Sequence, residues 1–346
     1  MNRTDLLKAL KAVIPGVAKG DALLVGADTF IFRDRMIQSY NDNLSITYPF
    51  DIGLELDDKM LAVKAVETVK VLEKMTGLDV QLKVKENSIE ITDEVTTLSM
   101  RLIEASTTNL LESLKLEELD WQALPTNFPK IMSLCLASVS KNVVHGPLVG
   151  VHVNGNDALS SDNFRATWAV LSEPMEPFTI PGTAVADLLK LEGLEKYAVT
   201  SSWVHFMSKE GAVFSSRLLA SEFPAEALKR MFPEEDGDIY TLPEGLNKAL
   251  DRAGILTYEQ DGGLQFVNLS HKDGWLIVSG ERQYGSITDK VKIKKNEWPK
   301  GVSINIQPNY LIDIMAKTKS FQVVGKLVYF KGEDFQHIVA TVVGND

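Results

Sequence analysis

The chain has 346 residues, of which 45% are hydrophobic and 24% are charged, so its length suits roughly two or three globular domains. Its net charge of −11 argues against a protein that coats nucleic acid with its whole surface, although a single basic face remains compatible with it. The amino-terminal stretch lacks an apolar run of signal-peptide length, no stretch reads as a membrane span, and the single cysteine, Cys135, excludes an internal disulfide framework. We therefore expect a cytoplasmic protein without a membrane partner.

Six helices are predicted along the chain, in three pairs. Apolar residues recur in them at three- and four-residue spacing, for example Val66, Val69 and Leu72. After the second helix of each pair, apolar and polar residues alternate at residues 78–92, 196–216 and 321–343, which predicts antiparallel strands. The predicted helical segments are residues 3–14, 61–76, 127–142, 183–192, 243–254 and 309–320.

A short turn-and-strand pattern occurs twice. "YNDNLSITYPF" begins at Tyr40 and "SSDNFRATWAV" at Ser160, and their Asp-Asn pairs start at Asp42 and Asp162, 120 positions apart (162 − 42). This spacing predicts a third turn near position 280, at Gly280-Glu281. Together with the paired helices, it indicates an α+β chain of three tandem units of about 115 residues, each with two helices on antiparallel strands. Acidic, proline-bearing joins place the domains at residues 1–118, 119–235 and 236–346.

Positive charge is concentrated on the predicted helices. The six segments hold 13 Lys plus Arg against 8 Asp plus Glu, a net of +5 that leaves −16 for the rest of the chain. Lys8 with Lys11, and Lys70 with Lys74, share a helix face, as Lys248 does with Arg252. Such residues most often only solvate the outer side of amphipathic helices, and the counts alone favour that interpretation over a basic binding surface.

The sequence contains no recognisable catalytic or cofactor motif. A P-loop, a dinucleotide-type glycine fingerprint and a Gly-x-Ser-x-Gly turn are all missing. The five histidines show no helical metal-ligand spacing, and Cys135 lies in an apolar helical run typical of a buried residue. We expect no catalytic residue, metal or cofactor, although an enzyme with an unrecognised pair of acid–base carboxylates stays an alternative.

In their order and spacing, these segments resemble the bacterial and phage DNA polymerase sliding clamps, the DNA polymerase III beta subunit family. "SSDNFRATWAVL" lies where that family has a Thr-Asp-Gly-His-Arg-Leu turn, and "SRLLASEFPAEALKRMFPEE" is similar to its Phe-Pro signature at the end of the second domain. "LNKALDRAGILTYEQDGGLQFV" and "PNYLIDIMAKTKS" resemble its third-domain helix and its last helix. The resemblance covers the whole chain. Among its departures, Asn163-Phe164 replaces Gly-His, and "ATVVGND" replaces the family's usual Met-Pro-Met-Arg-Leu ending.

The resemblance implies a processivity factor that is not an enzyme. Two chains would close head to tail into a ring around duplex DNA, with helices lining the hole and sheets outside. The partners implied are duplex DNA bound without sequence preference, a second copy of the chain, and a DNA polymerase and clamp loader that dock through short apolar peptides. The alternative is a scaffold of the same fold that binds proteins but not DNA.

The resemblance, taken with the basic helices, also assigns residues. The ring would close between an edge strand with Leu98 and Met100 and a facing strand with Ile255 and Leu256. DNA contacts are expected at Lys8, Lys11, Lys19, Lys70, Lys74, Lys130, Lys141, Lys248, Arg252, Lys317 and Lys319. An exposed apolar groove for partner peptides is expected at Val144, Asn163, Phe164, Arg165, Ala166, Pro233, Tyr310, Val328, Val339, Ala340 and Val342.

Overall fold

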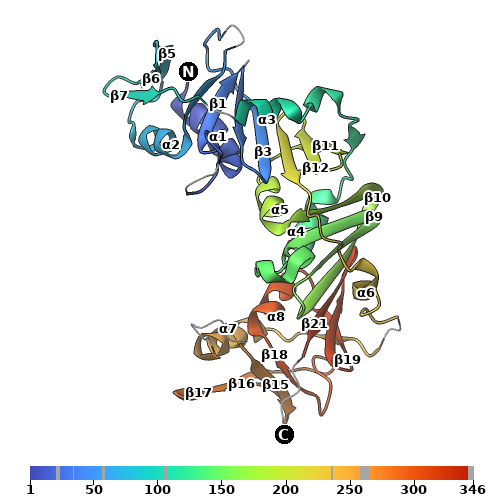
Figure 1. The fold of residues 1–346 in the computed structure, drawn as a ribbon. Coiled ribbons are helices and arrows are strands. Elements are labelled where there is room, and N and C mark those ends of the chain that lie inside the picture. The colour runs from blue at the N-terminus through green and yellow to red at the C-terminus, as the bar shows by residue number, and fades with distance from the viewer. Residues whose placement is uncertain are drawn as a thin grey trace. The chain divides into compact units, whose positions relative to one another are not determined.

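The computed structural model of the chain describes residues 1–20, 24–33, 35–56, 59–104, 107–234, 237–257 and 265–341. These residues form helices and antiparallel strand pairs, which confirms the expected α+β class. They fold into two compact units (Figure 1): unit 1 is Met1–Thr126 with Thr183–Leu219, and unit 2 is Asn127–Gly182 with Ala220–Asp346. The middle of the chain contributes to both units, and the division into three domains near residues 118 and 235 stays a prediction.

Two antiparallel sheets form most of unit 1. The larger has eight strands in the order β4-β1-β2-β3-β13-β12-β11-β8, and the smaller has three in the order β5-β6-β7. The large sheet joins distant parts of the sequence, because Ile46 of β3 lies opposite Phe214 of β13. The strands are β1 Thr29–Arg33, β2 Met36–Tyr40, β3 Leu44–Pro49, β4 Leu61–Lys64, β5 Gln81–Val84, β6 Ser88–Thr92, β7 Thr97–Arg101, β8 Gln122–Ala123, β11 Leu194–Val199, β12 Trp203–Ser208 and β13 Val213–Arg217.

Helices α1 (Arg3–Val13) and α2 (Ala65–Lys74) lie side by side against the eight-stranded sheet (Figure 1). The side chain of Asn2 caps α1 by accepting hydrogen bonds from the backbone N of Thr4 and Asp5 at 2.9 and 3.3 Å. Arg3 then donates to the carbonyl oxygens of Leu72 and Gly77, which binds the end of α2 to the start of α1. The other helical segments are η1 Ile14–Gly16, α3 Thr107–Ser113, η2 Leu116–Glu118 and α5 Gly182–Leu188, which begins at the boundary between the units.

Unit 2 also contains two antiparallel sheets. One has six strands in the order β14-β19-β20-β21-β10-β9, and the other has four in the order β17-β16-β15-β18. The six-stranded sheet joins the middle of the chain to its end, because Arg165 of β10 lies opposite Val339 of β21. The strands are β9 Gly150–Ser161, β10 Arg165–Pro181, β14 Tyr240–Thr241, β15 Val267–Lys272, β16 Trp275–Arg282, β17 Gly285–Lys292, β18 Ser303–Ile306, β19 Ser320–Val324, β20 Leu327–Lys331 and β21 Phe335–Ala340.

The helices of unit 2 cover its sheets. Helix α4 (Phe128–Leu136) packs on β9 and β10, whereas α7 (Leu246–Thr257) packs on β15, β16 and β17 and against α8 (Pro308–Met315). On its other face the six-stranded sheet is covered by an apolar cluster that includes Phe223, Phe232 and Leu228 of the short helix α6 (Ala225–Lys229). The segment η3, Val143–Val149, precedes β9.

Helices α4 and α8 end earlier than their apolar periodicity predicts, at Leu136 and Met315 in place of residues 142 and 320. After α4, Ser138 turns its hydroxyl toward Thr167 of β10, at 2.7 Å, and the backbone N of Ser140 donates to the carbonyl of Leu148. These bonds to residues outside the helix replace the helical ones.

Helix α7, in contrast, continues past its predicted end at Gly254 to Thr257. Glycine commonly follows the end of a helix, which is why the prediction stopped there. In the structure Gly254 stays helical, and a Cβ at this position would lie 3.4 Å from Cγ of Pro308 of α8, an ordinary contact distance. The glycine therefore does not end the helix, and the packing of α7 on α8 does not require it.

No helix among the described residues combines the length and the apolar character that crossing a membrane requires.

Candidate functional site

All eleven residues predicted to contact DNA are exposed. On α1, Lys8 and Lys11 lie opposite the buried Leu6 and Leu10, as the helical spacing predicts. The others on helices are Lys70 and Lys74 of α2, Lys130 of α4, and Lys248 and Arg252 of α7. Four residues lie in the connecting segments that follow η1, α4 and α8: Lys19, Lys141, Lys317 and Lys319.

Three of these basic residues are engaged by carboxylates. Lys11 of α1 forms a 2.6 Å ion pair with Glu73 of α2, and this bond holds the pKa of Glu73 below its ordinary value. Lys130 pairs with Asp334. Arg252 donates from Nε to Asp289 of β17 at 2.7 Å. Within the described ranges, no carboxylate lies at ion-pair distance from the other eight residues, so their charges are available to an external anion.

The turn between β9 and β10 is built by Asp162. Its Oδ1 accepts hydrogen bonds from the backbone N of Phe164 and Arg165 at 3.0 and 2.9 Å, and Asn163 takes a positive φ of 75°. Asparagine tolerates this conformation better than most residues, which explains the Asp-Asn pair.

The same turn chemistry occurs between β2 and β3, one residue away from the predicted match. There the side chain of Asn41, not Asp42, accepts from the backbone N of Asn43 and Leu44 at 2.9 and 2.8 Å. The equivalent residues are thus 121 apart (162 − 41). The third turn was placed wrongly, because Gly280 lies within β16 and the β16–β17 turn falls between Arg282 and Gly285.

Arg165 connects this turn to helix α8. Its Nε donates to Asp162 Oδ2 at 2.9 Å, and its Nη1 donates to Asp313 Oδ2 at 2.8 Å. The guanidinium also stacks on the ring of Tyr310, 4.1 Å from its centre. Burial raises the pKa of the Tyr310 hydroxyl, and the negative charge of Asp162 raises it further, so the phenol stays protonated.

The six-stranded sheet divides the predicted groove residues between its two faces. Antiparallel partners share a face, so Arg165, Val339 and Val328 form one row across β10, β21 and β20 on the side of α8. Ala166 points to the opposite face, where it packs in the apolar cluster with Phe232. Ala166, Val328 and Val339 are all buried, so they form core beneath the surface and not the exposed groove wall that was expected.

The other predicted groove residues lie at or near the surface. Phe164 and Ala340 are half-buried neighbours, because the backbone N of Ala340 donates to the carbonyl of Phe164 at 2.7 Å. Val144 in η3 is 84% exposed. From the same segment, Leu148 packs in the apolar cluster that contains Phe232. Asn163 is exposed, Tyr310 and Pro233 are half-buried, and Val342 lies outside the described residues.

Sequence reasoning missed the partners that hold Arg165. Asp313 follows Tyr310 by three residues, so both lie on one face of α8, and this spacing was a usable signal. Asp162 was identified as part of the turn but not as the acceptor of the Arg165 guanidinium. No local pattern brings α8 next to the β9–β10 turn, because that contact depends on the pairing of β10 with β21.

The predicted dimer residues are partly in different elements from those expected. Leu98 and Met100 are half-buried on β7, which is an edge strand of its three-stranded sheet, as predicted. Ile255 and Leu256 lie in the last turn of α7 and not on a strand, because the helix continues past Gly254. Ile255 is 75% exposed and Leu256 is half-buried. Strand β17, which packs on α7, is an edge strand of the four-stranded sheet.

Within the described residues, no group of three or more His, Cys, Asp or Glu side chains is arranged to hold a metal ion. Cys135 is fully buried, and burial raises the pKa of its thiol to about 12, so it behaves as a small apolar residue.

Comparison with solved structures shows which known fold the chain shares. The chain superposes over its whole length on the DNA polymerase sliding clamp of Bacillus subtilis, with a TM-score of 0.80 at 16% identity, covering 100% of this chain and 98% of that one. It is similar to the DNA polymerase III beta chain of Streptococcus pneumoniae (TM-score 0.81, 17% identity, 99% and 98% covered). It is also similar to the DNA polymerase III beta subunit of Thermotoga maritima (TM-score 0.79, 14% identity, 100% and 99% covered). No protein-family profile and no curated protein sequence matches the chain. The fold is that of the sliding clamps.

Proposed function

We propose that the protein is a DNA sliding clamp, a homodimeric ring that encircles duplex DNA and tethers a replicative polymerase without catalysing a reaction itself. The observation that carries this proposal is the correspondence of the fold over 99–100% of the chain and 98–99% of the three clamps. A fold shared from end to end with these clamps supports the same mode of action for this chain. We place the protein in the cytoplasm, with DNA.

The distribution of charge supports DNA as a partner. Eight exposed basic residues, among them Lys8, Lys70 and Lys248, have no carboxylate partner in the described part of an otherwise acidic chain. A ring holds DNA by topology, so a few lysines suffice for weak attraction to phosphates and do not impede sliding. The acidic remainder of the surface limits adsorption to nucleic acid elsewhere.

The edge strands support closure between unlike ends of two chains. Strand β7 of unit 1 and strand β17 of unit 2 each end a sheet and therefore present unpaired backbone N–H and C=O groups. We propose that β7 of one chain pairs with β17 of the other, with Leu98 and Met100 at one side and Ile255 at the other. Because these surfaces differ, two equal contacts related by a rotation would close a ring.

The surface beside the β9–β10 turn supports docking of a partner peptide. Phe164, Ala340 and Tyr310 are half-buried there, next to a turn that Arg165 and Asp162 hold rigid. Apolar side chains of a polymerase or clamp-loader peptide would gain area at this surface, and the polar backbone of the turn would fix their register.

Topological retention on DNA tests the proposal. The protein would be loaded onto a nicked circular plasmid with a clamp loader and ATP, separated from free protein, and then followed after the plasmid is cut once. We expect it to remain on circular DNA and to leave linear DNA, and to remain on linear DNA whose ends are blocked by bound protein. Equal retention on open linear and circular DNA would contradict encirclement. An intact dimer that is never retained would favour the scaffold that binds proteins only.

A further inference from the structure

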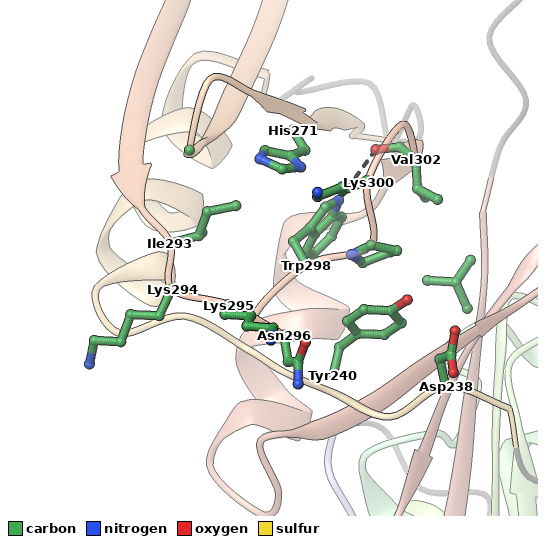
Figure 2. A pocket seen from close by; sticks show the side chains of 13 residues that line it. Asp238, Tyr240, His271, Ile293, Lys294, Lys295, Asn296, Trp298, Lys300 and Val302 are labelled. Atoms are coloured by element: carbon green, nitrogen blue, oxygen red, sulfur yellow. Dashed lines mark hydrogen bonds between the residues drawn. The ribbon is translucent and has the colours of Figure 1, made fainter.

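A cavity of about 830 Å³ lies in unit 2, outside every residue assigned above (Figure 2). One wall is the turn between β15 and β16 near His271, and another is the segment after β17 from Ile293 to Val302. Tyr240 of β14 and Val323 of β19 close the remaining side. Its volume falls in the range of specific binding pockets, which is about 300–1,000 Å³.

The inner part of the cavity is apolar and firmly packed. Trp298 is only 4% exposed, its Nε1 donates to the carbonyl oxygen of Val302 at 3.3 Å, and its ring lies 5.3 Å from that of Phe321. Tyr240 packs on the same Phe321 ring at 5.8 Å. With the half-buried Val302 and Val323, the rings of Trp298 and Tyr240 form a surface that would accept one large apolar side chain.

The rim is positively charged. Three lysines and one carboxylate, Asp238, line the cavity, a net of +2 (3 − 1) in a chain of −11. Lys294, Lys295 and Lys300 line the cavity and are exposed, and no carboxylate pairs with them among the described residues. Figure 2 shows Lys300 beside His271 and Trp298, with Lys294 extended outward at the rim and Asp238 at the far side, next to Tyr240.

The basic segment is held in place before any ligand arrives. The backbone N of Ile293 donates to the carbonyl oxygen of Gly274 at 3.2 Å, which binds the segment to the β15–β16 turn. Glu297 accepts from the backbone N of Lys294, and the carbonyl oxygen of Asn296 accepts from the backbone N of Thr241 of β14. Glu297 therefore forms its hydrogen bond within the segment. Because the segment is already ordered, binding a ligand loses little conformational entropy.

We propose that this cavity binds an acidic linear segment of a partner protein, with one large apolar side chain seated against Trp298, Val302 and Val323. The carboxylates of the segment would pair with Lys294, Lys295 and Lys300. The positive charge of the lysines favours an anionic ligand, and the buried apolar surface favours a ligand with a large apolar side chain. A stacked nucleotide base fits less well, because Trp298 is only 4% exposed and Val302 and Val323 offer no ring on which a base could stack.

Direct binding tests the proposal without reference to clamp activity. The probe is a fluorescein-labelled peptide with one central leucine flanked by glutamates, and its anisotropy is followed as the full-length protein is added. We expect saturable binding that weakens as salt is raised. A peptide with glycine for the leucine, and one with lysines for the glutamates, should bind much more weakly. Oligo(dT) and ATP serve as competitors.

Matched variants locate the binding. Lys294→Gln and Lys300→Gln should each lower the affinity for the peptide by up to about fivefold, which is the contribution of an exposed ion pair. Val302→Thr and Val323→Thr keep the shape of the side chain. They should lower the affinity for the leucine peptide but not the affinity for the glycine peptide. Lys326→Gln, an exposed lysine outside the cavity, is the control. The melting temperature and sedimentation coefficient of each variant show that fold and assembly are unchanged.

Two results would overturn the proposal. If the leucine and glycine peptides bind equally, or if Lys326→Gln weakens binding as much as Lys300→Gln, the attraction is general and the cavity is not its site. If oligo(dT) or ATP displaces the peptide and binds more tightly through Lys294 and Lys300, the ligand is a nucleotide and not a protein segment.

Discussion

The guanidinium of Arg165 lies 4.1 Å from the centre of the Tyr310 ring, and this contact joins the β9–β10 turn to helix α8. The Arg165 side chain is 10% exposed, and that of its partner Asp162 is 12% exposed. Both charges are therefore largely shielded from water. Because water cannot solvate them fully, each charge is stabilised by the other. The turn is rigid because this arginine is bound on three sides.

Replacing this arginine by an uncharged residue of similar length should destabilise the protein. In Arg165→Met, Asp162 keeps a buried negative charge without its cation, and we expect a loss of about 3 kcal/mol in the free energy of unfolding. Urea denaturation followed by circular dichroism measures it. Asp313→Asn is the control, because that side chain is 48% exposed and its pair should contribute less than about 1 kcal/mol. Equal losses would show that the Asp162 pair has no special weight.

Neutralising unpaired lysines on α1 and α2 should reduce the salt dependence of DNA binding. For Lys8→Gln with Lys70→Gln, the slope of log K against log salt should fall in magnitude by about 0.9 for each phosphate that is no longer neutralised. A salt titration of duplex binding provides the slopes. Lys83→Gln with Lys209→Gln removes the same charge from exposed positions not assigned to DNA. If both pairs change the slope equally, the helices are not the DNA-facing surface.

Charging the end of α7 should separate the proposed dimer without unfolding the chain. Ile255 is 75% exposed, so Ile255→Glu places its charge in water in a monomer but against apolar surface in the interface. Sedimentation velocity should show monomers. A cooperative melting transition of the variant should show that the monomer is still folded. Leu78→Glu, at a residue 78% exposed, should leave the dimer intact. A dimer that survives Ile255→Glu would remove α7 from the interface.

Acid should destabilise unit 1 partly through His205. The residue is 1% exposed and its Nδ1 lies 2.8 Å from Ser215 Oγ, and burial lowers its pKa from 6.5 to about 4. Between these values the unfolded chain binds a proton that the folded chain does not, so the free energy of unfolding falls as pH drops, by about 1 kcal/mol per pH unit. His205→Asn keeps a polar atom near Ser215 without titrating in this window. Its stability curve should be flatter than the parent's from pH 6.5 to 4, and parallel curves would exclude His205 as a source of the slope.

Elements whose signals are local could be predicted from the amino-acid order alone. The apolar spacing predicted α1 and α2, and the side-chain chemistry of Asn41 and Asp162 encodes the two matching turns. Lysines could also be placed opposite the buried helix faces, because that depends only on the helical repeat. Glycine was the weakest signal, since Gly254 is of a residue type that commonly follows the end of a helix and yet lies inside α7.

Which residues share a surface depends instead on how the strands pair in three dimensions. Val328, Val339 and Arg165 form one row because β20, β21 and β10 pair in a particular register, and a shift of one residue would send every side chain to the opposite face. The same pairing buries Ala166 on the other side and brings Asp313 to Arg165. The cavity around Trp298 arises in the same way, from strands and loops distant in sequence. Local residue order sets the period of an element, whereas the register between strands sets what that element faces.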